Sequence, residues 1–243
     1  KRMASSVEQT MLGREMFCCL TILKSKSGDK MRYGSYMINK TLGGLIVAIF
    51  FLYNSPLISL EKKEDLAEIK RIERYLNDIT TLKSSFIQIS SNGERLDGDI
   101  FISRPGRLRL QYEPSSPVLL VANGSTLTYV DWELEEISYI PTSETPLRAL
   151  IAPRIELDQF FKLGELERGL GTLAITLYDS EDESSGSFKL LFADKPLQLK
   201  QWFLKDATGT SVKISLLDVE RELELKDDLF TVDPFLFEKN KDK

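Results

Sequence analysis

The stretch Gly98–Tyr112 (GDIFISRPGRLRLQY) constrains the fold more than any other part of the chain. Apolar residues stand on both sides of an Arg-Pro-Gly sequence, and Leu108, Leu110 and Tyr112 then alternate with polar residues. Such an alternation places the apolar side chains on one face of a strand. Proline followed by glycine favours a tight turn. The stretch therefore predicts a half-buried hairpin that holds Arg104 at its rim.

Similar short runs, separated by turn residues, occur along most of the chain. Asn92-Gly93 and Asn123-Gly124 are strong hairpin signals, and a spacing of about 8–12 residues between strands is typical of sandwiches and barrels. The pattern predicts two antiparallel meanders. Their strands are expected at Leu82–Ser91, Glu94–Ser103, Arg107–Tyr112, Val118–Ala122, Ser125–Asp131 and Glu136–Ile140, then at Thr172–Asp179, Ser187–Ala193, Leu197–Lys205, Thr210–Leu217 and near Glu222–Val232.

Helical patterns occur at two places. The segment Glu61–Asn77 has an amphipathic pattern whose apolar residues are three to four positions apart. It predicts a helix packed on a sheet; a helix on a membrane surface is the alternative, which its mixed charges disfavour. Between the meanders, Thr145-Pro146 precedes LRALIA, and Leu157–Leu163 follows another proline, which predicts one or two short helices. The apolar residues of the first helix are Leu66, Ile69, Ile72, Leu76 and, just beyond it, Ile79.

Residue usage argues against several classes of function. Histidine is absent, which removes the commonest general base, the Ser/His and Cys/His nucleophile pairs and most transition-metal sites. The only cysteines, Cys18 and Cys19, are adjacent, so they indicate neither a disulfide framework nor a CxxC motif. The formal net charge is −5 and no Lys/Arg cluster is present. Nucleic acid and anionic membrane surfaces are therefore not expected as partners.

Two groups of acidic residues could be interpreted as a metal site or a catalytic pair. Asp97 and Asp99 lie in one predicted strand, and Glu181, Asp182 and Glu183 lie in a loop with serine and glycine. Neither group has the ligand spacing of a calcium loop, and a charge run in such a loop is normally solvated. We therefore predict no metal, no cofactor and no catalytic residue.

Residues 1–59 are interpreted as preceding the folded domain. Residues 1–36 are irregular and are expected to be either a non-native or an upstream segment. Basic residues followed by the apolar run Leu42–Leu52 predict a secretory signal peptide over 37–59, since a membrane-spanning helix needs about 20 apolar residues. An uncleaved anchor and a buried helix are the alternatives. One folded domain is expected over 60–237, followed by a charged tail at 238–243.

Four motifs, taken in order, resemble the periplasmic outer-membrane lipoprotein carrier family, the LolA-like proteins. They are YLNDITTLKSSFIQ, GDIFISRPGRLRLQY, VLLVANGSTLTYVD and TPLRALIA. The resemblance covers nearly everything from Leu60 to about Phe237, and Arg104-Pro105 at the turn is its most specific part. The chain departs from the family where tryptophan is frequent, because Phe101 and Leu110 stand at those positions.

The resemblance implies a fold that is mainly β with a helical lid (α+β). The expected architecture is an incomplete, strongly curved antiparallel β-barrel that encloses an apolar cavity for lipoprotein acyl chains. Arg104 is implied to hydrogen-bond to the lid and to help keep the cavity closed. The residues expected to line the acyl cavity are Phe101, Leu108, Leu110, Leu127, Tyr129, Leu147, Leu150 and Ile151.

By the same resemblance, the protein is expected to be a periplasmic carrier that moves lipoproteins from the inner to the outer membrane, with a role in outer-membrane biogenesis. It would act as a monomer and catalyse no reaction. The implied partners are lipoproteins, an inner-membrane lipoprotein-releasing transporter and an outer-membrane receptor. An alternative on the same fold is a periplasmic lipid-binding or lipoprotein-sensing regulatory module. A hydrolase is a third interpretation, which the absence of histidine weakens.

Overall fold

The computed structural model describes residues 56–113 and 116–234, with side chains for 63–113 and 116–234. The predictions for residues 1–36, for the signal peptide up to residue 55 and for the charged tail lie outside the described residues. Among the residues that the structure describes, no helix is long and apolar enough to cross a membrane.

Helix α2 (Pro56–Asn77) includes the predicted helix and begins earlier than expected. It crosses the boundary between two compact units, so only its last part, residues 72–77, belongs with the sheet. Ile72 and Leu76 are buried there, one helical turn apart, and Ile79 is buried just after the helix. The C-terminal members of the predicted apolar stripe therefore anchor the end of α2 in the core, whereas Leu66 is exposed.

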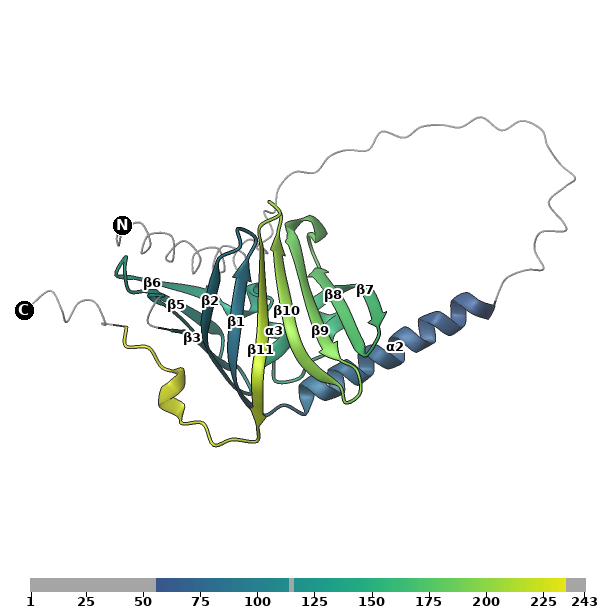
Figure 1. Ribbon diagram of the computed structural model, residues 1–243, viewed down its shortest axis with the longest axis horizontal. Coiled ribbons are helices and arrows are strands. Elements are labelled where there is room, and N and C mark those ends of the chain that lie inside the picture. Colours follow the sequence, from purple (N-terminus) through teal and green to yellow (C-terminus); the bar gives the residue numbers. More distant parts are fainter. Residues whose placement is uncertain (1–55, 114–115, 235–243) are drawn as a thin grey trace, which may run out of the picture. The chain divides into compact units, whose positions relative to one another are not determined.

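In the described part of the chain, eleven strands form one antiparallel sheet in the order β6-β5-β4-β3-β2-β1-β11-β10-β9-β8-β7 (Figure 1). The first and last strands pair in the middle, and β6 and β7 are the two edges, so the sheet is not closed. The predicted fold class, an incomplete antiparallel barrel with a few helices, is confirmed. The strands are β1 (Thr81–Ser90), β2 (Arg95–Ser103), β3 (Arg107–Tyr112), β4 (Val118–Asn123), β5 (Thr126–Asp131), β6 (Glu136–Pro141), β7 (Phe161–Gly169), β8 (Thr172–Asp179), β9 (Gly186–Ala193), β10 (Gln198–Asp206) and β11 (Ser211–Arg221).

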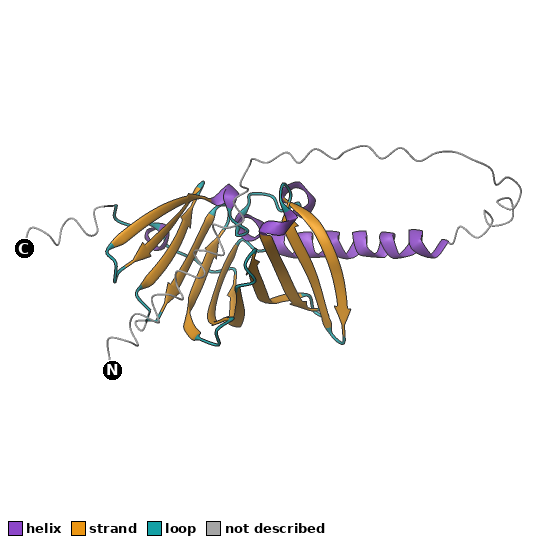
Figure 2. Cartoon of the chain, turned by 90° about the horizontal axis from the view of Figure 1, so that it is seen from above, coloured by secondary structure: helices purple, strands orange, loops and turns teal. Residues whose placement is uncertain are grey.

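The two edge strands are connected by residues 142–160, which we call the lid segment. It contains the 3-10 helix η2 (Thr142–Glu144) and the short helices α3 (Arg148–Ile151) and α4 (Leu157–Phe160), drawn in purple beside the strands in Figure 2. A further 3-10 turn, η3 (Glu183–Ser185), connects β8 and β9.

One predicted helix boundary was wrong. The helix expected over Leu157–Leu163 ends at Phe160, and Phe161 begins β7, a strand absent from the sequence prediction. Pairing with β8 overrides the local helical pattern. The ladder is irregular between Leu163 and Leu166. At Gly164 an added Cβ would lie 2.5 Å from the Tyr178 ring, so this position of the edge strand admits little besides glycine.

The two faces of the sheet are covered by different segments. Residues such as Leu108 and Leu110 belong to the face that we call the lid face. The same face carries Phe192, whose ring meets Tyr75 of α2 edge-on at 5.8 Å, and Phe161, which lies under the guanidinium of Arg148 from α3. The end of α2 and the lid segment therefore pack on this face.

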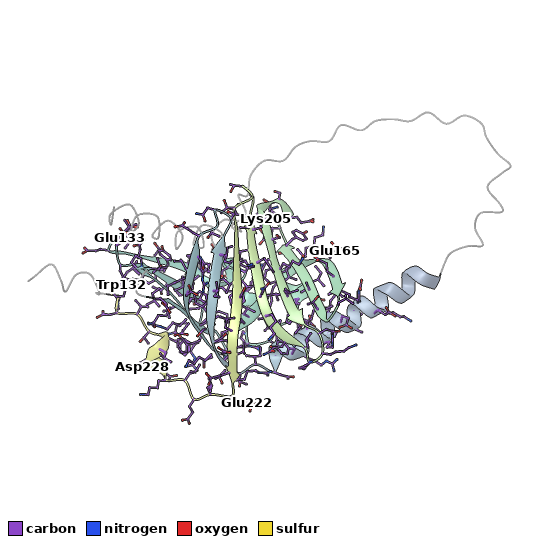
Figure 3. All side chains as sticks on the ribbon, viewed as in Figure 1. Trp132, Glu133, Glu165, Lys205, Glu222 and Asp228 are labelled. Carbon is purple, nitrogen blue, oxygen red and sulfur yellow. The ribbon has the colours of Figure 1, made fainter. Side chains whose placement is uncertain are left out.

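On the opposite face, the outer face, residues 222–234 cover the part formed by β2–β6, and we call them the C-terminal strap. Glu222 has a φ of 60°, a left-handed conformation that ends the extended chain after β11, so the strand predicted near Glu222–Val232 was wrong. The strap contains the 3-10 helix η4 (Asp227–Phe230), and Figure 3 labels Glu222 and Asp228 along it. Its apolar side chains, Leu225, Leu229, Phe230 and Val232, pack against Phe101, Leu119, Val121, Val130 and Ile137.

Polar contacts hold the strap beside its apolar ones. The Arg109 Nη1 donates to the Leu229 carbonyl at 3.0 Å, and Arg107 forms an ion pair with Asp227. The guanidinium of Arg107 also lies 5.4 Å from the centroid of the Phe230 ring. Alternate residues of β3 therefore serve different faces, since its arginines fix the strap while its leucines face the lid.

Replacing Phe230 by alanine should detach the strap. The side chain is 1% exposed, and truncating a buried phenylalanine costs about 3–5 kcal/mol of stability. The remaining contacts of the strap, which has no ladder hydrogen bonds, should be too weak to offset this loss. Hydrogen exchange measured by mass spectrometry should then rise in residues 222–234, while the strands stay protected. Glu224→Ala, an exposed change in the same segment, is the control and should leave exchange as in the wild type. Unchanged exchange in Phe230→Ala would contradict the assigned role of Phe230.

Candidate functional site

The turn between β2 and β3 fastens the lid segment to the sheet through Arg104. Its Nε and Nη2 donate to the Ala152 carbonyl at 3.1 and 2.8 Å, directly after α3. Its Nη1 donates to the carbonyls of Leu76 and Ile79, at the end of α2. One guanidinium thus joins the β2–β3 hairpin, the end of α2 and the end of α3. We call this arrangement the clasp.

An arginine suits this position because of its charge and its number of donors. The last carbonyls of a helix have no partner within the helix, and a guanidinium offers five N–H donors in a fixed plane. Burial lowers the pKa of Arg104 from its ordinary value, but arginine remains charged in proteins. The hydrogen bonds of the clasp are therefore charge-assisted and stronger than neutral ones.

Backbone groups of the same turn reinforce the clasp. The Gly106 N–H donates to the Ile151 carbonyl at 2.7 Å, so the turn also caps α3 through its main chain. Gly106 has a φ of +76°, and an added Cβ would lie 3.1 Å from the Cα of Gly124. The glycine predicted for the turn is thus required both by the conformation and by the close approach of the next hairpin.

Two residues of α2 that sequence reasoning missed also hold the lid segment. Asn77 donates from Nδ2 to the Ile155 carbonyl and accepts from the Ile155 N–H, both at 2.9 Å. Glu73, which is 4% exposed, accepts from the Leu157 N–H at the start of α4. Each of them directly follows a buried apolar residue of the helix, Ile72 or Leu76, and has no distinctive local signature.

Arg148 of α3 is a second arginine that holds the lid segment, and it was also missed. Its Nη2 donates to the Phe160 carbonyl at 2.6 Å, and it lies 3.8 Å from the Asp179 carboxylate. Its guanidinium lies 4.5 Å from the centroid of the Phe161 ring, a cation–π contact. Burial lowers the pKa of Arg148 from its ordinary value. Arg148 therefore ties α3 to α4 and to the β7–β8 edge of the sheet.

Four of the residues predicted to line an acyl cavity lie together on the lid face. In the register of β3, β4 and β5, Leu110 and Tyr129 flank Leu120, while Leu108 and Leu127 flank Ala122. All four predicted side chains are at most 4% exposed. They form a continuous apolar surface across three strands.

The other predicted lining residues lie elsewhere. Leu147, Leu150 and Ile151 are buried within the lid segment. Phe101 pairs with Arg109 on the outer face and packs under the strap, so the structure does not bring it together with Leu108 and Leu110. Its neighbours Ile100 and Ile102 occupy the lid face instead.

A partly open cavity of about 350 Å³ lies between the lid segment and the hairpin turns. Such a volume is at the lower end of the roughly 300–1,000 Å³ typical of ligand pockets. The cavity borders the clasp rather than the apolar surface of β3–β5. Its lining residues include Gly106, Gly124, Arg148, Ile151, Ala152 and Phe160.

Four of the five acidic residues considered as a metal or catalytic site make local contacts through their carboxylates. Asp97 is paired with Arg95, and Asp99 accepts from Ser85 Oγ at 2.9 Å. Asp182 accepts from the Ser184 N–H within its own turn, and Glu183 is paired with Lys162. Among the residues that the structure describes, no three His, Cys, Asp or Glu side chains gather in a way that could hold a metal ion.

The fold is thus an incomplete antiparallel barrel whose two edge strands are connected by a helical lid segment, which Arg104 holds against the sheet. The family model for the outer membrane lipoprotein carrier protein LolA matches residues 77–233, well over half of the chain. The chain belongs to the LolA family.

Individual relatives are distant. The chain is 24% identical over 115 residues to an uncharacterized protein of Rickettsia prowazekii, covering 47% of this chain and 54% of that protein's length. It is 27% identical over 172 residues to the outer-membrane lipoprotein carrier protein of Legionella pneumophila (strain Lens). This match covers 67% of this chain and 84% of that protein. The crystal structure of a LolA superfamily protein from Nitrosomonas europaea has a TM-score of 0.42 and 9% sequence identity, and the match covers 68% of this chain and 98% of that one. This similarity is too low to add to the family assignment.

Proposed function

We propose that this protein is a periplasmic carrier that binds the acyl chains of lipoproteins on its lid face and transfers them from the inner to the outer membrane. Its partners would be lipoproteins, a releasing transporter in the inner membrane and an acceptor at the outer membrane. The role needs binding and release but no catalysis. Membership in the LolA family and the carrier names of relatives support the proposal.

The observation that carries the proposal is the clasp over an apolar surface. An acyl chain exposed to water costs about 0.8 kcal/mol per CH₂, so a carrier must offer an apolar surface of its own. Leu108, Leu110 and Leu127 provide such a surface. The lid segment is held by polar contacts through Arg104, which can break and re-form, so a ligand can reach the surface when the lid opens.

Native mass spectrometry of the full chain, purified from the cell envelope, tests this proposal. The protein should form a one-to-one complex with a tripalmitoylated lipopeptide added as a probe, and should retain acylated cargo from the cells. The same peptide without its acyl chains is the control and should not bind. If neither the probe nor any acylated cargo is retained, the carrier function is wrong.

A further inference from the structure

Three buried hydrogen-bond donors on the lid face have no partner among the residues that the structure describes. They are Gln88 Nε2, Ser90 Oγ and Trp202 Nε1. The three residues are 0, 4 and 1% exposed. Buried polar groups in folded proteins nearly always have a hydrogen-bond partner, so three unpaired donors on one face require an explanation.

The strand register places the three donors in one region of the sheet. Gln88 of β1 and Trp202 of β10 both pair with Ile214 of β11, one from each side. Neighbouring strands are about 4.8 Å apart, so these two backbone positions are separated by about 10 Å. Ser90 lies two residues beyond Gln88 on the same face, about 7 Å along the strand. Figure 1 shows β1, β11 and β10 side by side.

The hydrogen-bonding capacity that remains is that of donors. The Tyr112 hydroxyl donates to Gln88 Oε1 at 2.6 Å, which leaves the amide nitrogen of Gln88 as its free group. Burial raises the pKa of Tyr112 well above its ordinary value, so the phenol stays protonated and remains the donor of this hydrogen bond. The indole of Trp202 can only donate, and the hydroxyl of Ser90 can donate. The group that satisfies these residues must therefore be an acceptor.

The surroundings favour an uncharged acceptor. The two rows of paired residues that contain the donors are otherwise apolar and include no Lys or Arg. A carboxylate placed there would be buried without a counter-ion, at a high energetic cost. A carbonyl oxygen accepts hydrogen bonds without carrying a charge. The rows are Leu96–Gln88–Ile214–Trp202–Leu190 and Ser90–Val212–Leu204–Phe188.

We propose that Gln88, Ser90 and Trp202 form a carbonyl-binding site on the lid face, which takes the ester or amide carbonyl of an acylated ligand. The site adds recognition of the linkage to the apolar surface, so the protein would distinguish acyl chains from alkyl chains of equal length. This inference rests on the proposed function, since the ligand reaches the site only when the lid face is open to it.

Three matched amphiphiles test the inference on the full chain: monopalmitoylglycerol, its amide analogue, and the corresponding hexadecyl ether, which lacks a carbonyl. The wild-type protein should bind the ester or the amide about 3- to 10-fold more tightly than the ether, as one or two hydrogen bonds would give. The double variant Trp202→Phe/Ser90→Ala should lose this preference. The lost indole volume affects all three ligands alike, so the ratio of affinities isolates the hydrogen bonds.

A control variant separates the carbonyl site from general packing on the same face. Phe192→Leu changes an apolar side chain of the lid face and should keep the wild-type ratio of ester to ether affinity. Binding of only the ester, or only the amide, would identify which linkage the site takes. Equal binding of all three ligands by the wild type, or a preference that survives in the double variant, would show that the donors hold only water. If none of the three binds, the proposed function itself fails.

Discussion

The lid segment of an Arg104→Leu variant should exchange its backbone amide hydrogens about 10- to 100-fold faster than that of the wild-type protein. Charge-assisted hydrogen bonds contribute about 1.5–3 kcal/mol, which corresponds to one to two decades in the ratio of open to closed lid. Leucine cannot donate to the Ala152 or Leu76 carbonyls. The strands should stay paired, because a turn side chain contributes no ladder bond. Hydrogen exchange measured by mass spectrometry over residues 142–160 checks this result.

The same variant should load lipoprotein but transfer it poorly. Loading survives because the apolar surface of the lid face is intact, whereas release weakens because the empty closed state no longer favours unloading. Arg104→Lys keeps the positive charge but loses the planar guanidinium with its several donors. Its lid exchange and its lipoprotein transfer should therefore lie between those of the wild type and Arg104→Leu. Arg95→Leu removes an exposed arginine paired with Asp97 and should behave as the wild type. Equal lid exchange and equal transfer in Arg104→Leu would make Arg104 an ordinary turn residue.

Replacing Leu110 by glutamate should destabilise the protein by about 3–5 kcal/mol at neutral pH, a large share of the 5–15 kcal/mol typical of a domain. Leu110 is 0% exposed and lies between Ile100 and Leu120 on the lid face, so the new carboxylate would be buried among apolar side chains. Acyl binding should be lost with it. Urea unfolding followed by circular dichroism, together with binding of the lipopeptide, measures both effects.

The effect of this glutamate should depend on pH in a defined direction. Burial raises the pKa of the new carboxyl in the folded state above its unfolded value of about 4.3. The part of the penalty that comes from the charge is therefore absent below that value and grows as the pH rises towards the folded pKa. Leu110→Gln should show no such dependence, and Gln111→Glu, an exposed change at the next position, should cost little. A folded Leu110→Glu protein that still binds the lipopeptide would contradict the proposed binding surface.

Most strands of the sheet could be predicted because turn residues and the alternation of apolar and polar residues are visible within short stretches of sequence. Asn-Gly turns and period-two alternation marked β1 to β6, and β3 and β8 were placed at the observed residues. β7 was missed because an edge strand with Gly164 and an irregular ladder lacks a clear alternation. The C-terminal strap was misjudged because apolar residues in a covering segment resemble those of a strand.

The candidate site was only partly predictable, since its contacts join segments far apart in sequence. Phe101 was grouped with Leu108 through the family resemblance, whereas the run Ile100-Phe101-Ile102 is apolar on both faces of the strand. The strap that covers the outer face is the reason for that run, and no local pattern indicates it. Arg104 was expected to donate to the lid, and it does donate to the carbonyl of Ala152, the last residue of TPLRALIA. Its hydrogen bonds to the end of α2 were not predicted. Asn77 and Arg148 have no local signature for their roles.

The pairing of the first strand with the last has a consequence for the order in which the chain can fold. β1 and β2 can form a hairpin as soon as both are available, but the other side of β1 has no partner until β11 has been synthesised. Contacts this distant in sequence form slowly, and an unpaired strand edge invites association with other chains. Phe86 and Ile87 lie along that edge. An incompletely synthesised chain therefore exposes the edge of β1, which is paired only once β11 is available.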